Sequence, residues 1–339
     1  MPKFLIIRFS SIGDIIQCMS VVSGILNKYP NAQIDWISRK DMGSTLAIDK
    51  RINKIWAFNK STGLKGLLNM ADELKKEKYD YVYDAHNNIR SHILKFKLKS
   101  IFSKSPKITT RSKERFKRFL YFRLNINRFN WPFRGMESFR KPLAKWGITD
   151  FTTNNISKKV EYSFNPDIVS NLSPLIKENT ITLVPSANWD MKRWPVNHWK
   201  ELITLLPDYN FIILAGPTDN FCKEIAAVAP ERVNNLQGKT SLIESSYITL
   251  ISNLVISGDT GFLHSADLFN TPAIALMGPT AFGHPSSPTS KVVELPLPCR
   301  PCTKDGRGCC KDALYQRCMV EITPQEIANQ VCNNVPTQY

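Results

Sequence analysis

The chain has 339 residues, of which 42% are hydrophobic and 22% charged, so its composition is that of a folded globular protein and not of a disordered one. One hydrophobic core rarely serves more than about 250–300 residues, and the length therefore predicts two domains. No apolar run reaches the roughly 20 residues that a membrane-spanning helix needs, and the apolar stretch before Arg8 is too short for a secretion signal. We therefore expect a cytoplasmic protein.

Strand-like and helix-like segments alternate in the first half of the chain. Strands are predicted over residues 3–9, 32–38, 52–58 and 79–85, and helices from about Asp14 and over 66–78. An apolar stripe from Ile15 to Leu26 predicts one helix, which Pro30 ends. Such alternation builds a parallel sheet with helices on both faces.

The same alternation returns after a polar, turn-rich linker at about 150–178. Strands are predicted over 180–186, 210–216, 254–259 and 272–278, and helices from Pro195, after Thr218, over 241–252, from Gly261 and over 322–331. This indicates an α/β fold of two Rossmann-like domains, residues 1–165 and 166–339. Ligands of such sheets bind at the carboxyl ends of the strands, so residues directly after strands are candidates for function.

The stretch RFSSIGD directly follows the first predicted strand. A strand-to-helix junction leaves unpaired backbone N–H groups that favour anions, and the small Ser10, Ser11 and Gly13 let a substrate approach the backbone. Asp14 has two interpretations. It either stabilises the first helical turn through the helix dipole or acts as a general base on a substrate hydroxyl.

Three motifs follow strands of the second half. In KRWP, Lys192 and Arg193 suit a phosphate, although a solvated basic loop is the alternative. In GDTGFLH, helix-terminal amides at Thr260 and Gly261 suit a pyrophosphate. In GPTD, Asp219 either accepts hydrogen bonds from ribose hydroxyls or serves as a helix N-cap.

Residues 90–145 carry 17 lysines and arginines against two acidic residues, Glu114 and Glu137. Such a concentration of positive charge indicates an anionic partner. Aromatic residues lie among these cations, an arrangement typical of a lipid-headgroup interface and also of a surface for single-stranded nucleic acid.

Five of the eight cysteines lie between Cys299 and Cys318. Cytoplasmic thiols stay reduced, so a cluster indicates a metal before disulfides. The predicted ligands are Cys299, Cys302, Cys309 and Cys318, with Cys310 as the alternative to Cys309. Four thiolates suit a structural zinc or iron ion, and buried thiols without a metal are the other interpretation.

Five segments together resemble glycosyltransferase family 9, the lipopolysaccharide heptosyltransferases: FLIIRFSSIGD, YDYVYDAHNNIRSHIL, KRWP, GDTGFLHSADLFNTPAIALMGPT and CTKDGRGCCKDALYQRCMVEITPQEI. They occur in the family's order from residue 3 to about residue 330. The resemblance implies the GT-B architecture of two facing Rossmann-like domains, the first binding the acceptor and the second the nucleotide sugar. It also implies an inverting transfer of heptose from ADP-heptose to the lipopolysaccharide inner core.

The resemblance further implies roles for single residues. Asp14 matches the family's catalytic base, and Lys192 matches the lysine that contacts the donor phosphates and stabilises the departing ADP. Donor binding is expected of Ser186, Lys192, Asp219, Asp259, Thr260, Gly261 and His264, and acceptor binding of Ser10, Ser11, Gly13, Arg90, Arg111 and Arg115. Catalysis is expected to need no cofactor, because helix amides and one cation can stabilise a leaving diphosphate.

The expected partners are ADP-heptose, an anionic glycolipid acceptor and the cytoplasmic face of the inner membrane, contacted peripherally, and no nucleic acid. Two alternatives remain. The same family could use a protein or another glycan as acceptor, or the basic-aromatic stretch could make the chain a nucleic-acid-binding protein. The second alternative leaves the SSIGD and DTGFLH motifs without a role.

Overall fold

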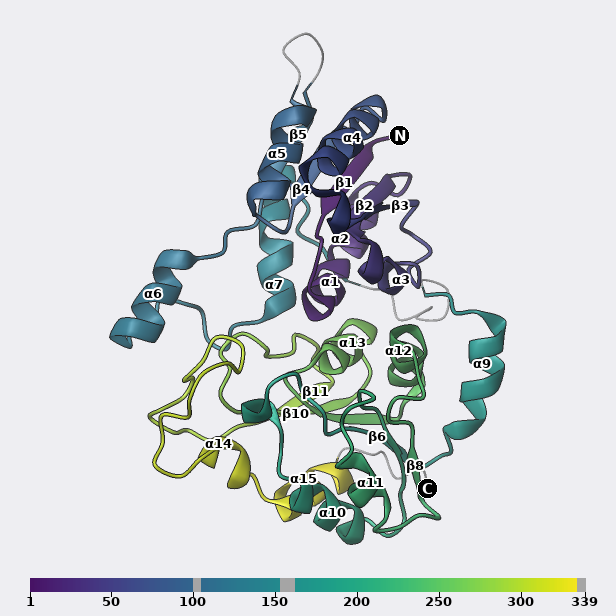
Figure 1. Ribbon diagram of the computed structural model, residues 1–339, viewed down its shortest axis with the longest axis vertical. Coiled ribbons are helices and arrows are strands. Elements are labelled where there is room, and N and C mark those ends of the chain that lie inside the picture. The colour runs from purple at the N-terminus through teal and green to yellow at the C-terminus, as the bar shows by residue number, and fades with distance from the viewer. Residues whose placement is uncertain (100–104, 153–161, 334–339) are drawn as a thin grey trace. The chain divides into compact units, whose positions relative to one another are not determined.

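The computed structural model describes residues 1–99, 105–152 and 162–333. Contacts divide the chain into two compact units, Met1–Phe116 with Met136–Ser163, and Lys117–Gly135 with Phe164–Tyr339 (Figure 1). Residues 117–135, which the sequence analysis counts with the first half, thus belong to the second unit by their contacts. Residues 153–161 of the predicted linker lie outside the described residues.

The first unit is built on a five-stranded, all-parallel sheet in the order β3-β2-β1-β4-β5. Its strands are β1 (Lys3–Ile7), β2 (Gln33–Arg39), β3 (Lys54–Phe58), β4 (Tyr81–Asp84) and β5 (Lys107–Thr110). Its helices are α1 (Ile12–Met19), α2 (Val21–Lys28), α3 (Gly43–Leu46), α4 (Gly63–Lys76), α5 (Ile89–Leu98) and α7 (Gly135–Arg140), while α6 (Arg115–Leu124) spans the division between the units.

Apolar side chains fill both faces of this sheet. Leu5 of β1 clusters with Leu67 of α4 and Leu94 of α5 on one face. The preceding residue of β1, Phe4, points to the opposite face, where its ring stacks on the ring of Tyr81 with 4.4 Å between the ring centroids. Burial on both faces is what a parallel sheet requires, because its crossover helices cover both sides.

The prediction of a single helix along the apolar stripe is wrong. Two helices, α1 and α2, occupy the segment and meet at Ser20. The Ser20 hydroxyl donates to the backbone carbonyl of Gln17 at 2.7 Å, a local bond that competes with the helical ladder. The stripe residues Ile15, Met19 and Val22 are fully buried on both sides of the break.

The second unit is built on a six-stranded, all-parallel sheet in the order β11-β10-β9-β6-β7-β8. Its strands are β6 (Thr180–Val184), β7 (Asn210–Ile213), β8 (Val233–Asn235), β9 (Leu254–Gly258), β10 (Ala273–Leu276) and β11 (Ser290–Val293). Its helices are α9 (Pro166–Leu172), α10 (Val196–Leu205), α11 (Cys222–Ala226), α12 (Leu242–Ile251), α13 (Gly261–Phe269), α14 (Arg317–Val320) and α15 (Pro324–Cys332).

Helices cover both faces of this sheet as well. One apolar cluster joins the sheet to α10, α11 and α15, and a second joins its other face to α9, α12 and α13. Helix α15 confirms the helix predicted over 322–331, with Thr323 as N-cap residue accepting from the Glu326 amide at 3.2 Å and Pro324 in the first turn. The predicted α/β class with parallel sheets is confirmed.

Strand order reverses once in each sheet, between β1 and β4 in the first unit and between β6 and β9 in the second. At such a point the loops after two neighbouring strands run to opposite faces and leave room for a ligand. The RFSSIGD segment follows β1, the KRWP loop follows β6, and the GDTGFLH segment follows β9. Within the described part of the chain, we find no helix long and apolar enough to cross a bilayer.

Candidate functional site

Asp14 lies in the first turn of α1 and is held by Arg8, the residue that follows β1. The Arg8 guanidinium pairs with the Asp14 carboxylate and donates a second hydrogen bond to the backbone carbonyl of Ala85 at 2.9 Å. The Ser11 hydroxyl donates to the same carboxylate at 2.9 Å instead of capping the helix. The Arg8 side chain is 8% exposed and that of Asp14 38%, so a buried cation supports a carboxylate that remains accessible.

The charges of this pair act on two further groups, Arg111 and His86. Arg111 is buried, with its Nε donating to the Ser138 hydroxyl at 3.0 Å and its guanidinium 3.8 Å from the centre of the Phe139 ring. Burial lowers the pKa of Arg111, and the charge of Asp14 opposes that shift. Burial, aided by the charge of Arg8, lowers the pKa of His86 to about 4, so its imidazole is neutral at pH 7.

The predicted acceptor residues do not all lie together in the structure. Ser10, Ser11 and Gly13 lie on the junction from β1 to α1, and the charge of Arg111 acts on Asp14 there. Arg90 lies in the first turn of α5, its guanidinium 5.8 Å from the centre of the Phe58 ring, and Arg115 is the first residue of α6. The structure thus brings Ser11 and Arg111 to Asp14, and places Arg90 and Arg115 on other helices.

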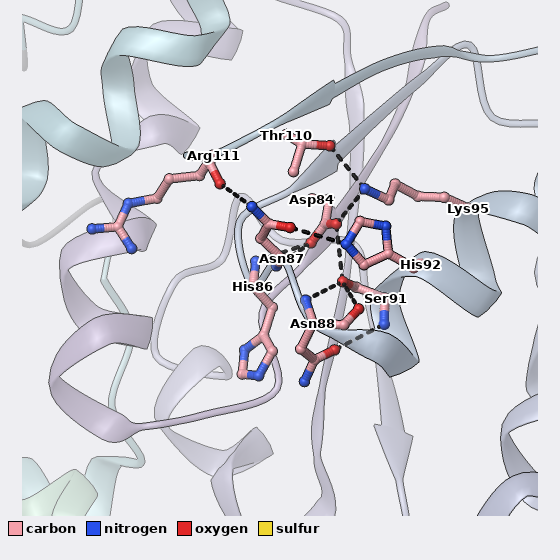
Figure 2. A network of polar contacts seen from close by, with 9 residues as sticks. All are labelled: Asp84, His86, Asn87, Asn88, Ser91, His92, Lys95, Thr110 and Arg111. Carbon is pink, nitrogen blue, oxygen red and sulfur yellow. Dashed lines mark hydrogen bonds and ion pairs between the residues drawn. The ribbon is translucent and has the colours of Figure 1, made fainter. Parts of the chain in front are cut away.

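A buried polar network surrounds Asp84, the last residue of β4 (Figure 2). Its carboxylate accepts from the Asn87 amide at 2.7 Å, the Ser91 hydroxyl at 2.9 Å and the Lys95 ammonium at 2.7 Å. The Asn87 side chain donates to the backbone carbonyl of Arg111 at 2.9 Å, while the Arg111 side chain extends away from Asp84. This network fixes the start of α5 and the backbone from which Arg111 projects.

In the second unit, Lys192 and Asp259 form a buried ion pair at the strand-order reversal. The Lys192 ammonium lies 3.0 Å from Asp259 Oδ2, and each side chain is 13% exposed. The Thr280 hydroxyl donates to Oδ2 at 2.8 Å, and His264 Nε2 lies 3.4 Å from Oδ1. Burial alone would raise the pKa of Asp259, but Lys192 and His264 outweigh it and hold the pKa well below its ordinary value. Asp259 is therefore ionised.

Asp259 directly precedes the N-terminus of α13. Thr260 is the N-cap residue, its hydroxyl accepting from the Leu263 amide at 3.4 Å, and Gly261 is the first helical residue. The first amides of a helix have no acceptor within the helix and carry partial positive charge. A cation and a helix N-terminus thus share one small region, which suits a diphosphate.

Two glycines that the sequence analysis did not single out make room for this pair. A Cβ added at Gly283 would lie 2.1 Å from Asp259 Oδ1, and one added at Gly306 would lie 2.6 Å from Lys192 Cδ. Gly306 also has a φ of +93°, which disfavours other residues. Thr280 and Gly283 follow β10, the strand next to β9. Their position after a strand could therefore have identified them as candidate site residues.

We expect Gly283→Ala to lower the free energy of unfolding by about 1–3 kcal/mol, because Asp259 is held by several partners and cannot move aside without breaking contacts. Gly43→Ala is the matched control, since its Cβ would meet only ordinary contacts at 3.5 Å or more. Thermal unfolding of both variants measures the effect. A Gly283→Ala variant as stable as the Gly43→Ala variant would contradict the assigned packing.

Asp219 is a second buried carboxylate of this unit, in the loop after β7. It accepts from the Ser186 hydroxyl at 2.5 Å, the Gly216 amide at 2.9 Å and the Arg193 guanidinium at 3.3 Å. The alternative of a helix N-cap is wrong, because Phe221 is the N-cap residue of α11. Asp219 joins Ser186 and Arg193, two residues of the segment after β6, to the loop after β7.

The five clustered cysteines differ in their surroundings. Cys318 is buried, which raises its pKa to about 12, Cys299 and Cys302 are half-buried with raised pKa values that burial also causes, Cys310 is half-buried, and Cys309 is exposed. Among the described residues, no three His, Cys, Asp or Glu side chains gather in an arrangement that could hold a metal ion. As placed, the thiols do not fit a four-thiolate site. The metal remains a prediction, which elemental analysis of the purified protein tests.

A further ion network lies at the start of this cysteine segment. Glu294 accepts from Arg300 at 2.7 Å and lies 3.0 Å from His284 Nε2. Burial raises the pKa of Glu294, but the hydrogen bonds and charges of His284 and Arg300 outweigh burial and lower the pKa to about 2. In the unfolded chain the Glu294 carboxyl would have the ordinary glutamate pKa of about 4.3, so it would bind a proton more tightly than in the folded protein.

This difference predicts acid sensitivity. Stability from Glu294 is fully present above the unfolded pKa of about 4.3 and is lost as the pH falls through the folded pKa. We expect Glu294→Gln to make the melting temperature less dependent on pH in this window, whereas exposed Glu231→Gln should leave the dependence unchanged. Melting curves at a series of acidic pH values measure it. Equal pH dependence in Glu294→Gln and the parent would contradict the assignment.

Comparison with known proteins places these features in context. The family model described as glycosyltransferase family 9 (heptosyltransferase) matches residues 67–310. Lipopolysaccharide core heptosyltransferase OpsX of Haemophilus influenzae is 25% identical over 287 residues, covering 81% of this chain and 79% of that protein. Lipopolysaccharide heptosyltransferase 2 of Escherichia coli K12 is 23% identical over 358 residues, covering 97% of each. The structure of E. coli ADP-heptose LPS heptosyltransferase II superimposes with a TM-score of 0.69 at 20% identity, covering 98% of both chains.

Proposed function

Since the chain belongs to glycosyltransferase family 9, the heptosyltransferases, and has the GT-B fold, we propose that it transfers heptose from ADP-heptose to an anionic sugar of the lipopolysaccharide inner core. The names of its relatives, which include lipopolysaccharide core heptosyltransferases, support this donor and acceptor. A protein or another glycan is the alternative acceptor.

In this proposal the acceptor hydroxyl attacks the anomeric carbon, the bond from that carbon to the diphosphate breaks, and ADP departs. Attack in line behind the leaving group inverts the anomeric configuration. Asp14 takes the proton of the attacking hydroxyl, which suits a carboxylate that Arg8 keeps in place and whose side chain is 38% exposed. Ser11 and Arg111 help to orient the acceptor, Arg111 through its charge.

Lys192 is proposed to stabilise the charge that develops on the departing ADP. An ammonium has three N–H donors, so Lys192 can keep Asp259 and still donate to a phosphate. The amides at Thr260 and Gly261 add partial positive charge without reorganisation, so these groups supply the stabilisation that the step needs. Asp219 and Ser186 are proposed to meet the ribose side of the donor, and His264 to steady Asp259.

The observation that carries the proposal is the buried Lys192 beside the N-terminus of α13 at the strand-order reversal. The test is to supply ADP-heptose with deacylated lipopolysaccharide core, with a serine-containing peptide or with a capsule sugar, and to measure ADP release and product. The proposal expects transfer to the core alone, with the anomeric configuration inverted in the product by NMR. Transfer to the peptide or the capsule sugar instead would overturn the acceptor, and retention would overturn the role of Asp14.

A further inference from the structure

Helix α6 and the loop after it have an inner side that is anchored to the second unit. The ring of Phe282 lies 5.9 Å from that of Phe122, 5.3 Å from that of Phe129 and 4.8 Å from that of Phe133. The Arg118 guanidinium lies 4.2 Å from the centre of the Phe282 ring. These contacts fix which side of α6 faces the protein and which side faces outward.

The outward side carries large apolar side chains where a surface helix is normally polar. Phe116 is 72% exposed and Phe119 55% exposed, and their spacing of three residues puts them on one face of the helix. Leu124, at the end of α6, and Trp131, in the loop, are exposed as well. A globular protein in water gains nothing from a row of exposed aromatic rings, so this face indicates a contact with something apolar.

The positive charge around these rings indicates which kind of apolar partner they contact. Residues 115–134 carry six cations and no acidic residue: Arg115, Lys117, Arg118, Arg123, Arg128 and Arg134. Two copies of the chain would bring like charges together at this face, which argues against self-association. Apolar rings on one side of a helix, flanked by arginines and lysines, are the pattern of helices that lie in the headgroup region of anionic membranes. The loop after α6 also carries an exposed tryptophan, Trp131, a residue type enriched in that region.

We propose that the exposed apolar side chains of α6, Phe116, Phe119 and Leu124, insert into the headgroup region of an anionic lipid bilayer. The exposed cations Arg115, Arg123 and Arg128 contact lipid phosphates while the rings reach the acyl boundary. The rationale rests on the proposed function, because a glycolipid acceptor is presented at a bilayer surface, but the binding itself requires no catalysis.

The test is co-sedimentation of the full chain with vesicles of phosphatidylcholine containing phosphatidylglycerol, and with vesicles of phosphatidylcholine alone. Binding to the anionic vesicles is expected to exceed binding to the neutral ones and to fall as salt is raised. The double variant Phe116→Ser/Phe119→Ser should lower partitioning about tenfold or more, since both rings then no longer enter the bilayer. Leu64→Ser is the matched control, because Leu64 is 59% exposed on α4 beside lysines and should leave binding unchanged.

Transfer to soluble deacylated core separates this inference from the proposed function. The double variant is expected to keep wild-type activity with that acceptor, because neither ring has been assigned to catalysis or substrate binding. Absent vesicle binding, or equal binding by wild type and double variant, would overturn the inference while leaving the function untouched. Binding of single-stranded RNA, or a dimer that the double variant dissociates, would overturn it in favour of another partner. Vesicle binding without heptose transfer would overturn the function alone.

Discussion

Lys192→Met is expected to lower kcat by about 10²–10³-fold, the usual effect of removing one group that stabilises transition-state charge. It should also lower the free energy of unfolding by about 3–5 kcal/mol, because it leaves the buried Asp259 carboxylate without its main cation. Steady-state kinetics and chemical denaturation measure the two effects. The loss of activity and the loss of stability have separate causes, so a second variant can distinguish them.

The double variant Lys192→Met/Asp259→Asn distinguishes the loss of activity from the loss of stability. With no unpaired buried charge, the double variant should recover most of the lost stability, while its activity should stay as low as that of Lys192→Met. Lys223→Met, which removes an exposed lysine on α11, serves as the control and should change neither quantity. Recovery of activity together with stability would show that Lys192 supports only the fold, contrary to the account.

Asp14→Asn is expected to lower kcat/KM by about 10²–10⁴-fold, the range attributed to one general base. Asparagine keeps the size of the side chain and an oxygen that can accept from Ser11, and Arg8 keeps its bond to Ala85. The fold should therefore survive, as circular dichroism can verify. The rise of kcat/KM with pH that reports deprotonation of the base should disappear in the variant.

Asp41→Asn is the matched control, because Asp41 is also an aspartate paired with an arginine, Arg39, but at an exposed position. Its activity and pH profile should equal those of the parent. If Asp14→Asn retained the parental pH profile with reduced kcat, the carboxylate would act through the structure of α1 and not as a base.

Much of the fold follows from the sequence, and the exceptions have physical reasons. The central strands were predictable because most of their residues are apolar, β-branched or aromatic. The edge strands β5, β8 and β11 were missed, since KITT, VNN and SKVV are short and partly polar. The break at Ser20 was missed because a serine hydroxyl bond to a carbonyl leaves the apolar spacing intact. The assignment of 117–135 to the second unit depends on the ring of Phe282, distant in sequence.

The candidate site was predictable as a set of positions but not as a set of contacts. Asp14 and Lys192 were identified because each lies in a motif after a strand, and Asp259 because of the family resemblance. That Lys192 pairs with Asp259 could not be predicted from local sequence, because the contact depends on β6 and β9 being neighbours in the sheet. Arg8 was passed over, although a charged residue directly after a buried apolar strand was a usable signal.

The central claim is that the chain moves heptose from an ADP-linked donor. The most direct measurement offers the purified protein a panel of ADP-, UDP- and GDP-linked sugars with deacylated core as acceptor, and records which nucleoside diphosphate is released. The account predicts ADP release from ADP-heptose, matched by one heptose added to the acceptor for each ADP. Release of UDP or GDP instead, or ADP release without a glycosylated product, would contradict it.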